Sequence, residues 1–155
     1  MAEFALERST TISAPAAAIY PLLADFHEWP KWSPWEDLDP ALARTYSGAE
    51  SGTGAVYEWS GNRKAGQGRM EILDAAAPSK VVIDLRFLKP FKARNTTTFT
   101  VEEAGATTTV RWEMRGPKTT VMKILGGVLG IEKSIAKDFD KGLAALKTVA
   151  EKPTV

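Results

Sequence analysis

The sequence predicts an α+β domain in which a curved antiparallel sheet of about seven strands grips one long C-terminal helix. Two observations support this prediction. Apolar and polar residues alternate over residues 4–12 and again through most of residues 44–115, as they do in half-buried strands. Beyond Pro117 the apolar spacing changes to three and four residues, which is typical of a helix. No linker or repeat divides the 155 residues, so we expect one domain spanning residues 1–155.

Two short helices are expected after the first strand. Ser13 or Ala14 is the predicted cap of the first, which should cover residues 16–24 and end before Asp25. Asp25 is the predicted cap of the second, because its carboxylate can accept from free backbone N–H groups. The second helix should end near Trp32, since Ser33 and Pro34 break the pattern.

Glycine turns and β-branched residues mark the strands that follow. Gly48, Gly52 and Gly54 bracket a turn, and Asp84 and Arg86 should face outward from a strand whose apolar residues face inward. After about six strands in this region, one helix should cover residues 119–150. The strands read most clearly from the sequence are 56–60, 68–72, 81–87, 94–102 and 107–115.

Composition narrows the class of function. The chain has 20 Lys and Arg against 19 Asp and Glu, so no basic surface for nucleic acid or anionic membrane is indicated. It has no cysteine and one histidine, His27, so neither a disulfide, a thiolate zinc site nor a histidine-based metal cluster is expected. The N-terminus lacks the features of a signal peptide, and no apolar stretch is long enough to span a bilayer. We therefore expect a cytoplasmic protein.

The apolar phase of the strands predicts a ligand cavity. One helix is only about 10 Å wide, so it should not fill the concave face of a strongly curved sheet. Space left there would be lined by large apolar groups, as small-molecule sites usually are. The aromatic side chains could also close this space. The lining residues share one alternation phase and are Trp59, Met70, Leu85, Phe87, Phe99, Trp112 and Met114.

Four polar residues interrupt the apolar pattern and are further candidates for ligand binding. Glu132 lies near the centre of the apolar helix face, and Arg8 is in phase with the inward residues of the first strand. Asn95 and Thr97 share the phase of Phe99. Polar groups in an apolar pocket orient ligands or transfer protons. Alternatively, Glu132 reaches out at the cavity mouth and Arg8 extends past the sheet edge.

Aromatic and glycine clusters have both a structural and a functional interpretation. Trp32 and Trp35 are expected to plug one end of the core, whereas Trp29 is either core or a lid over the cavity. His27 is expected on the surface. Gly126, Gly127 and Gly130 indicate either a helix kink that admits ligand or close packing on the sheet. The choice between these two interpretations of the glycines stays open.

Several short motifs follow one another in a characteristic order. They are Ile12-Ser13-Ala14-Pro15, Leu23-Ala24-Asp25-Phe26, Trp29-Pro30-Lys31-Trp32-Ser33-Pro34-Trp35, Trp59-Ser60-Gly61, Thr109-Val110-Arg111-Trp112 and Phe139-Asp140-Lys141-Gly142-Leu143. Their order and spacing resemble the START-like superfamily, specifically its polyketide cyclase/dehydrase and lipid-transport branch. The resemblance covers nearly the whole chain and implies a helix-grip fold.

This superfamily includes carriers, receptors, cyclases and co-chaperones, so the fold does not settle the activity. Binding of a hydrophobic small molecule, such as a lipid, polyketide or aromatic metabolite, without a bound cofactor or metal is the favoured function. A cyclase, dehydratase or hydrolase is the enzyme alternative, with Glu132 as its candidate acid or base. A co-chaperone-like interaction module is the third. The sequence indicates neither the ligand nor the oligomeric state.

Overall fold

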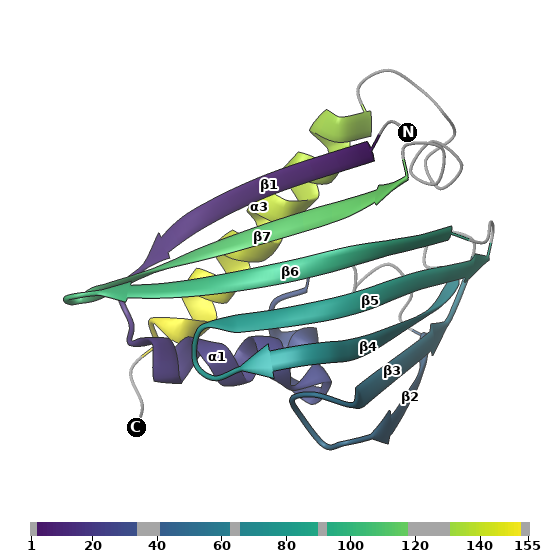
Figure 1. Ribbon diagram of the computed structural model, residues 1–155, viewed down its shortest axis with the longest axis horizontal. Coiled ribbons are helices and arrows are strands. Elements are labelled where there is room, and N and C mark those ends of the chain that lie inside the picture. Colours follow the sequence, from purple (N-terminus) through teal and green to yellow (C-terminus); the bar gives the residue numbers. More distant parts are fainter. Residues whose placement is uncertain (1–2, 34–40, 63–65, 90–92, 118–130, 153–155) are drawn as a thin grey trace.

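Seven antiparallel strands form one sheet in the order β1-β7-β6-β5-β4-β3-β2 (Figure 1). The computed structural model describes residues 3–33, 41–62, 66–89, 93–117 and 131–152. The strands are β1 (Glu3–Ile12), β2 (Ala43–Gly48), β3 (Ala55–Ser60), β4 (Gln67–Ala76), β5 (Lys80–Lys89), β6 (Ala93–Ala104) and β7 (Thr107–Pro117). The helical segments are α1 (Ala16–Ala24), the 3-10 helix η1 (Phe26–Lys31) and α3 (Ile131–Ala150).

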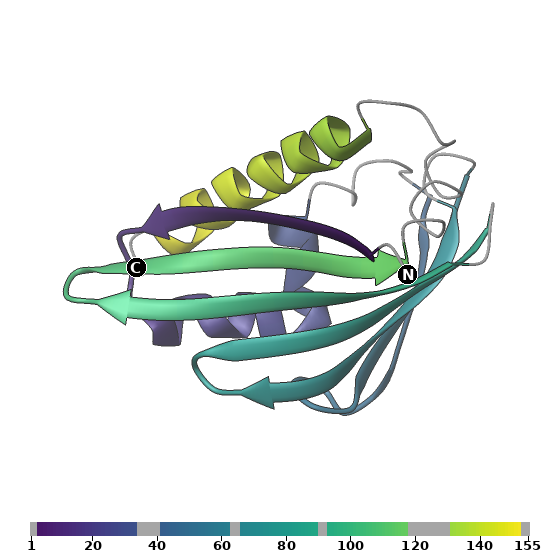
Figure 2. The same ribbon diagram turned by 45° about the horizontal axis from the view of Figure 1, so that its top comes forward.

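From β2 to β7 each strand pairs with the next one in the chain, and β1 completes the sheet by pairing with β7. Short connections favour this order, because an antiparallel neighbour needs only a turn to be reached. Helices α1 and α3 lie on the same side of the sheet, which bends around them (Figure 2). The predicted fold class is therefore confirmed.

The long C-terminal helix is confirmed where the structure describes it. Helix α3 spans Ile131–Ala150, whereas the first part of the predicted helix, including Gly126, Gly127 and Gly130, lies largely outside the described residues. The helix is fastened to the edge strand β1 by polar contacts. One of them is the Lys147 ammonium, which donates to the backbone carbonyl of Thr11 at 3.1 Å.

The predicted cap of the first helix is wrong. Pro15 is the N-cap of α1 and its side chain makes no capping hydrogen bond. The N–H of Ala16 instead donates to the Glu103 carboxylate at 2.7 Å, from the end of β6. A carboxylate from a distant strand thus stabilises this helix N-terminus. The cap predicted for the second helix is confirmed, because Asp25 accepts from the His27 N–H at 2.9 Å.

The outer face of β5 carries a buried carboxylate that the sequence did not predict. Asp84 does point away from the core as predicted, but its side chain is only 3% exposed. Arg86 and Arg94 cover it and donate to its two oxygens at 2.7 and 2.8 Å. Burial alone would raise the pKa of Asp84, but the hydrogen bonds and charges of the two arginines outweigh it and hold that pKa below the usual range.

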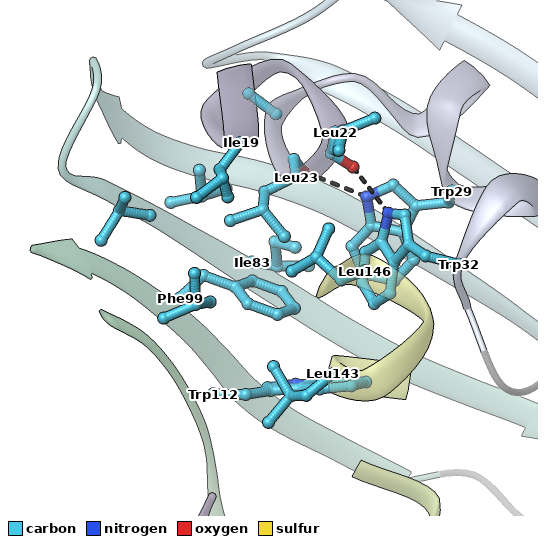
Figure 3. Packing of buried hydrophobic residues seen from close by; sticks show 14 of the residues in the cluster. Ile19, Leu22, Leu23, Trp29, Trp32, Ile83, Phe99, Trp112, Leu143 and Leu146 are labelled. Atoms are coloured by element: carbon cyan, nitrogen blue, oxygen red, sulfur yellow. Dashed lines mark hydrogen bonds between the residues drawn. The ribbon is translucent and has the colours of Figure 1, made fainter. Parts of the chain in front are cut away.

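Aromatic side chains of the η1 segment pack into the core, where Trp29 and Trp32 both meet Phe99 of β6 edge to face (Figure 3). Trp29 and Trp32 are buried, and their indole N–H groups donate to the carbonyls of Leu23 and Leu22 at 3.0 and 2.8 Å. Buried tryptophans usually need such a partner. Trp32 is therefore a core residue as predicted, and Trp29 is core rather than a lid. Trp35 lies outside the described residues.

Candidate functional site

Strand pairing sets side chains into rows across the inner, concave face of the sheet. One row runs from β4 through β5 to β6, and the next runs from β5 through β6 to β7. These rows hold six residues that we call the inner-face site: Met70, Leu85 and Asn95 in the first row, and Ile83, Thr97 and Met114 in the second. The register confirms the inward phase that the sequence predicts for Met70, Leu85, Asn95, Thr97 and Met114, and it places Ile83 on the same face.

Asn95 and Thr97 are the polar members of the inner-face site. Their side chains are 3% and 4% exposed, and their neighbours in the site are apolar. Among the described residues, neither the Asn95 amide nor the Thr97 hydroxyl has a hydrogen-bond partner. Most buried polar side chains in folded proteins have one. These two groups therefore require an explanation beyond packing.

Gly116 on β7 makes room for the Asn95 side chain. A Cβ atom at residue 116 would lie 2.8 Å from the Cβ of Asn95 and 3.2 Å from the carbonyl oxygen of Arg94. Side-chain atoms do not approach so closely, so any larger residue would push β6 or the asparagine away. The Asn95 side chain therefore fits on the inner face only because residue 116 is a glycine.

A row of aromatic groups adjoins the inner-face site. Trp59 on β3 and Phe87 on β5 flank Gly68 on β4, and their rings meet edge to face at 5.8 Å. A Cβ at Gly68 would lie 2.2 Å from the indole of Trp59, so the glycine lets this ring lie flat on the strand. Trp59 and Phe87 are half-buried, which places them toward the rim of the inner face.

Phe99 and Trp112, two of the predicted lining residues, are surrounded by other aromatic rings, and their contact with a ligand stays a prediction. Trp112 stacks on Phe139 of α3 with ring centroids 4.0 Å apart and planes 5° apart. Phe99 meets Trp32 edge to face at 5.8 Å and Trp112 at 5.0 Å. Both side chains are at most 1% exposed. Figure 3 shows both side chains within the hydrophobic core.

Arg8 faces α3 from β1, opposite Trp112 in the register. Its Nε and Nη2 donate to the two carboxylate oxygens of Asp140 at 2.9 and 2.8 Å. The hydrogen bond and charge of Asp140 raise the pKa of Arg8 above its ordinary value. Both side chains are about half exposed. Arg8 therefore links the edge strand to the helix, and its contact with a ligand stays a prediction.

Two further titratable residues, Glu132 and His27, are not placed in the inner-face site by the described part of the structure. Glu132 is the second residue of α3, but its side chain is not among those the structure describes. His27 is exposed. Its Nδ1 lies 2.8 Å from the Asp25 carboxylate, to which the Nδ1–H tautomer donates, and its ring stacks on Tyr46 with ring centroids 4.1 Å apart. The described residues gather no group of three or more His, Asp or Glu side chains around a common point.

Sequence reasoning missed the partners of the charged residues. Asp140 is 132 positions from Arg8, and no spacing rule connects a strand residue with a helix residue over that distance. The signal that existed was the phase of Arg8, which places it on the helix-facing side of β1. A charged side chain in that phase would destabilise the fold if it were buried without a carboxylate partner.

The sheet order, the C-terminal helix on its concave side and the two short helical segments after β1 define a helix-grip protein. The chain belongs to the polyketide cyclase/dehydrase and lipid transport family, whose model matches residues 3–151. Among the described residues, no helix has the length and hydropathy needed to cross a membrane. No functionally curated protein matches the sequence at a significant level.

Solved structures share this fold at low sequence identity. Protein CV1439 from Chromobacterium violaceum superposes with a TM-score of 0.67 and 14% identity, covering 96% of this chain and 98% of that one. Ms6760 from Mycobacterium smegmatis gives 0.67 and 15%, covering 97% and 92%. DynU16, a protein in the dynemicin biosynthetic locus, gives 0.66 and 13%, covering 96% of this chain. The match covers 47% of DynU16, so this chain spans about half of that protein's length.

Proposed function

We propose that this protein binds a hydrophobic small molecule non-covalently at the inner-face site, without a bound cofactor. The observation that carries the proposal is the pair of buried polar groups on Asn95 and Thr97, which lack partners among the described residues. Each such group costs about 1–3 kcal/mol when it stays unpaired. A ligand that supplies the missing hydrogen bonds recovers that cost.

Two further features support this function. The two methionines of the site, Met70 and Met114, are unbranched and polarisable, so they repack around ligands of different shape at little cost. The family description includes lipid transport, which is a binding function for apolar molecules. We place the protein in the cytoplasm on its sequence, as a prediction.

The ligand class is tested by native mass spectrometry of protein purified from its own host. We expect an added mass of a small apolar molecule that is lost on gentle activation. A neutral fluorescent dye such as Nile red then provides a binding assay, because its emission rises in an apolar site. Purified protein that carries no small molecule and binds no apolar dye would contradict the proposal.

The position of the site is tested by filling it. Met114→Trp adds a large ring to the inner-face site, so we expect dye affinity to fall at least tenfold while the far-UV circular dichroism stays unchanged. The matched control is Leu88→Trp, because Leu88 is 41% exposed and in phase with the outer residues of β5. Equal affinity in both variants would place the dye elsewhere.

A further inference from the structure

The polar side chains of the inner-face site restrict which polar groups its ligand can have. Asn95 offers two amide hydrogens and one carbonyl oxygen, and Thr97 offers a hydroxyl that both donates and accepts. Both side chains are more than nine-tenths buried and point to the same face of β6. They are neutral groups set among Leu85, Ile83 and Met114.

The spacing of the two groups limits what they can bind. They are two residues apart on one strand, so their Cβ atoms are separated by roughly 7 Å along β6. One ligand oxygen can lie between them, or each can meet an oxygen of its own. In both cases the ligand needs an oxygen attached to an apolar skeleton.

The charge of that oxygen is limited by the surrounding side chains. Arg8 is the charged residue that β1 places on this face, and both of the contacts described for it go to Asp140. A ligand carboxylate beside Asn95 would lose its hydration without gaining a cation from these residues, which is costly. A hydroxyl or carbonyl would lose much less.

We infer that the ligand is an apolar molecule bearing an uncharged oxygen, a hydroxyl or a carbonyl, which hydrogen-bonds to Asn95 and Thr97. This inference rests on the proposed function and narrows its ligand class. Apolar lining residues retain the skeleton, and the amide and hydroxyl select its neutral oxygen. Because the two groups are covered rather than open to solvent, side chains around them must move as the ligand enters, and the unbranched Met70 and Met114 can do so at little cost.

The test compares three probes of similar shape by isothermal titration calorimetry at pH 7: 2-naphthol, 2-methylnaphthalene and 2-naphthoate. Phenolic hydroxyls have a pKa of about 10, so 2-naphthol is neutral at pH 7, whereas the carboxylate of 2-naphthoate is charged. We expect 2-naphthol to bind and 2-naphthoate to bind at least tenfold more weakly. Equal or tighter binding of 2-naphthoate would overturn the neutral assignment.

The residues are tested by the ratio of 2-naphthol affinity to 2-methylnaphthalene affinity. Asn95→Leu and Thr97→Val keep side-chain size and remove the polar groups, so each should lower this ratio, by about tenfold for one good hydrogen bond. Thr97→Val changes only a hydroxyl into a methyl group and serves if Asn95→Leu does not fold. The control is Thr96→Val, an exposed neighbour on the outer face, which should leave the ratio unchanged.

The outcomes separate this inference from the proposed function. If wild-type protein binds both neutral probes and the ratio is the same in every variant, the inference is wrong and hydrophobic binding stands. If wild-type protein binds none of the three probes and no dye, the proposed function is wrong and the inference falls with it.

Discussion

Thr97 on β6 and Thr108 on β7 are both buried on the inner face, but they differ in hydrogen bonding. The Thr108 hydroxyl donates to the backbone carbonyl of Ala14 at 2.6 Å, whereas the Thr97 hydroxyl has no partner among the described residues. Thr108 fastens the segment between β1 and α1 to the sheet. Thr97 contributes no such contact, which is why we assign it to ligand binding.

This difference predicts opposite effects of the same substitution. Thr108→Val should lower the free energy of unfolding by about 1–3 kcal/mol, because it leaves the Ala14 carbonyl unpaired. Thr97→Val should leave stability unchanged or raise it, because a methyl group replaces an unpaired hydroxyl. Urea unfolding followed by circular dichroism measures both. Equal losses in the two variants would show that Thr97 has a structural partner.

Much of the fold could be predicted because local pattern and global structure agree. Alternation set the phase of every inner-face residue, and the turn glycines Gly48 and Gly54 have the positive φ angles that such turns require. The cap of α1 could not be predicted, since Glu103 comes from another strand. The burial of Asp84 depends on two arginines whose placement follows from strand register.

The candidate site was predicted less completely than the fold. The phase of Asn95 and Thr97 is a local property, so the sequence indicates it. Their lack of partners depends on which side chains meet them across the sheet, which the register and Gly116 decide. The enclosure of Phe99 follows from rings on η1 and β7, and no local spacing reports such contacts.

The arginine pair around Asp84 predicts a pH dependence of stability. The folded-state pKa of Asp84 lies below its ordinary value of 3.8, so the unfolded chain takes up the proton first as the pH falls. The stabilisation is therefore complete well above pH 3.8 and is lost as the pH falls through the folded-state pKa. Asp84→Asn should lower the free energy of unfolding by about 2 kcal/mol at pH 7.

The difference in free energy of unfolding between wild type and Asp84→Asn should shrink below about pH 4. Urea unfolding from pH 7 to pH 3 measures it. Glu113→Gln is the control: Glu113 pairs with Arg115 at a more exposed position, and surface pairs contribute about 0–1 kcal/mol. If this difference in free energy of unfolding stays constant from pH 7 to pH 3, the Asp84 carboxylate does not stabilise the fold through its charge.

Glu132 distinguishes a carrier from an enzyme. If its carboxylate meets the ligand in a carrier, Glu132→Gln should change affinity by about 1–3 kcal/mol, as a hydrogen bond to a charged group does. If it is a general acid or base, the same change should lower turnover of the co-purified molecule by about 10² or more while binding survives. Mass spectrometry of that molecule over time measures turnover.

The control for Glu132 is Asp138→Asn on the same helix. Six residues separate them, which at about 100° per residue puts Asp138 on a different side of α3. Unchanged affinity and unchanged turnover in Glu132→Gln would exclude this residue from the site in both roles.

The central claim, that the inner face binds an apolar ligand, is tested most directly by NMR of ¹³C-methyl-labelled methionine. The chain has four methionines, and Met70 and Met114 belong to the inner-face site. Addition of 2-naphthol should shift the methyl signals of Met70 and Met114 with one common dissociation constant, equal to that from calorimetry. The claim would be contradicted if calorimetry shows that 2-naphthol binds but neither methyl signal moves at a saturating concentration of 2-naphthol.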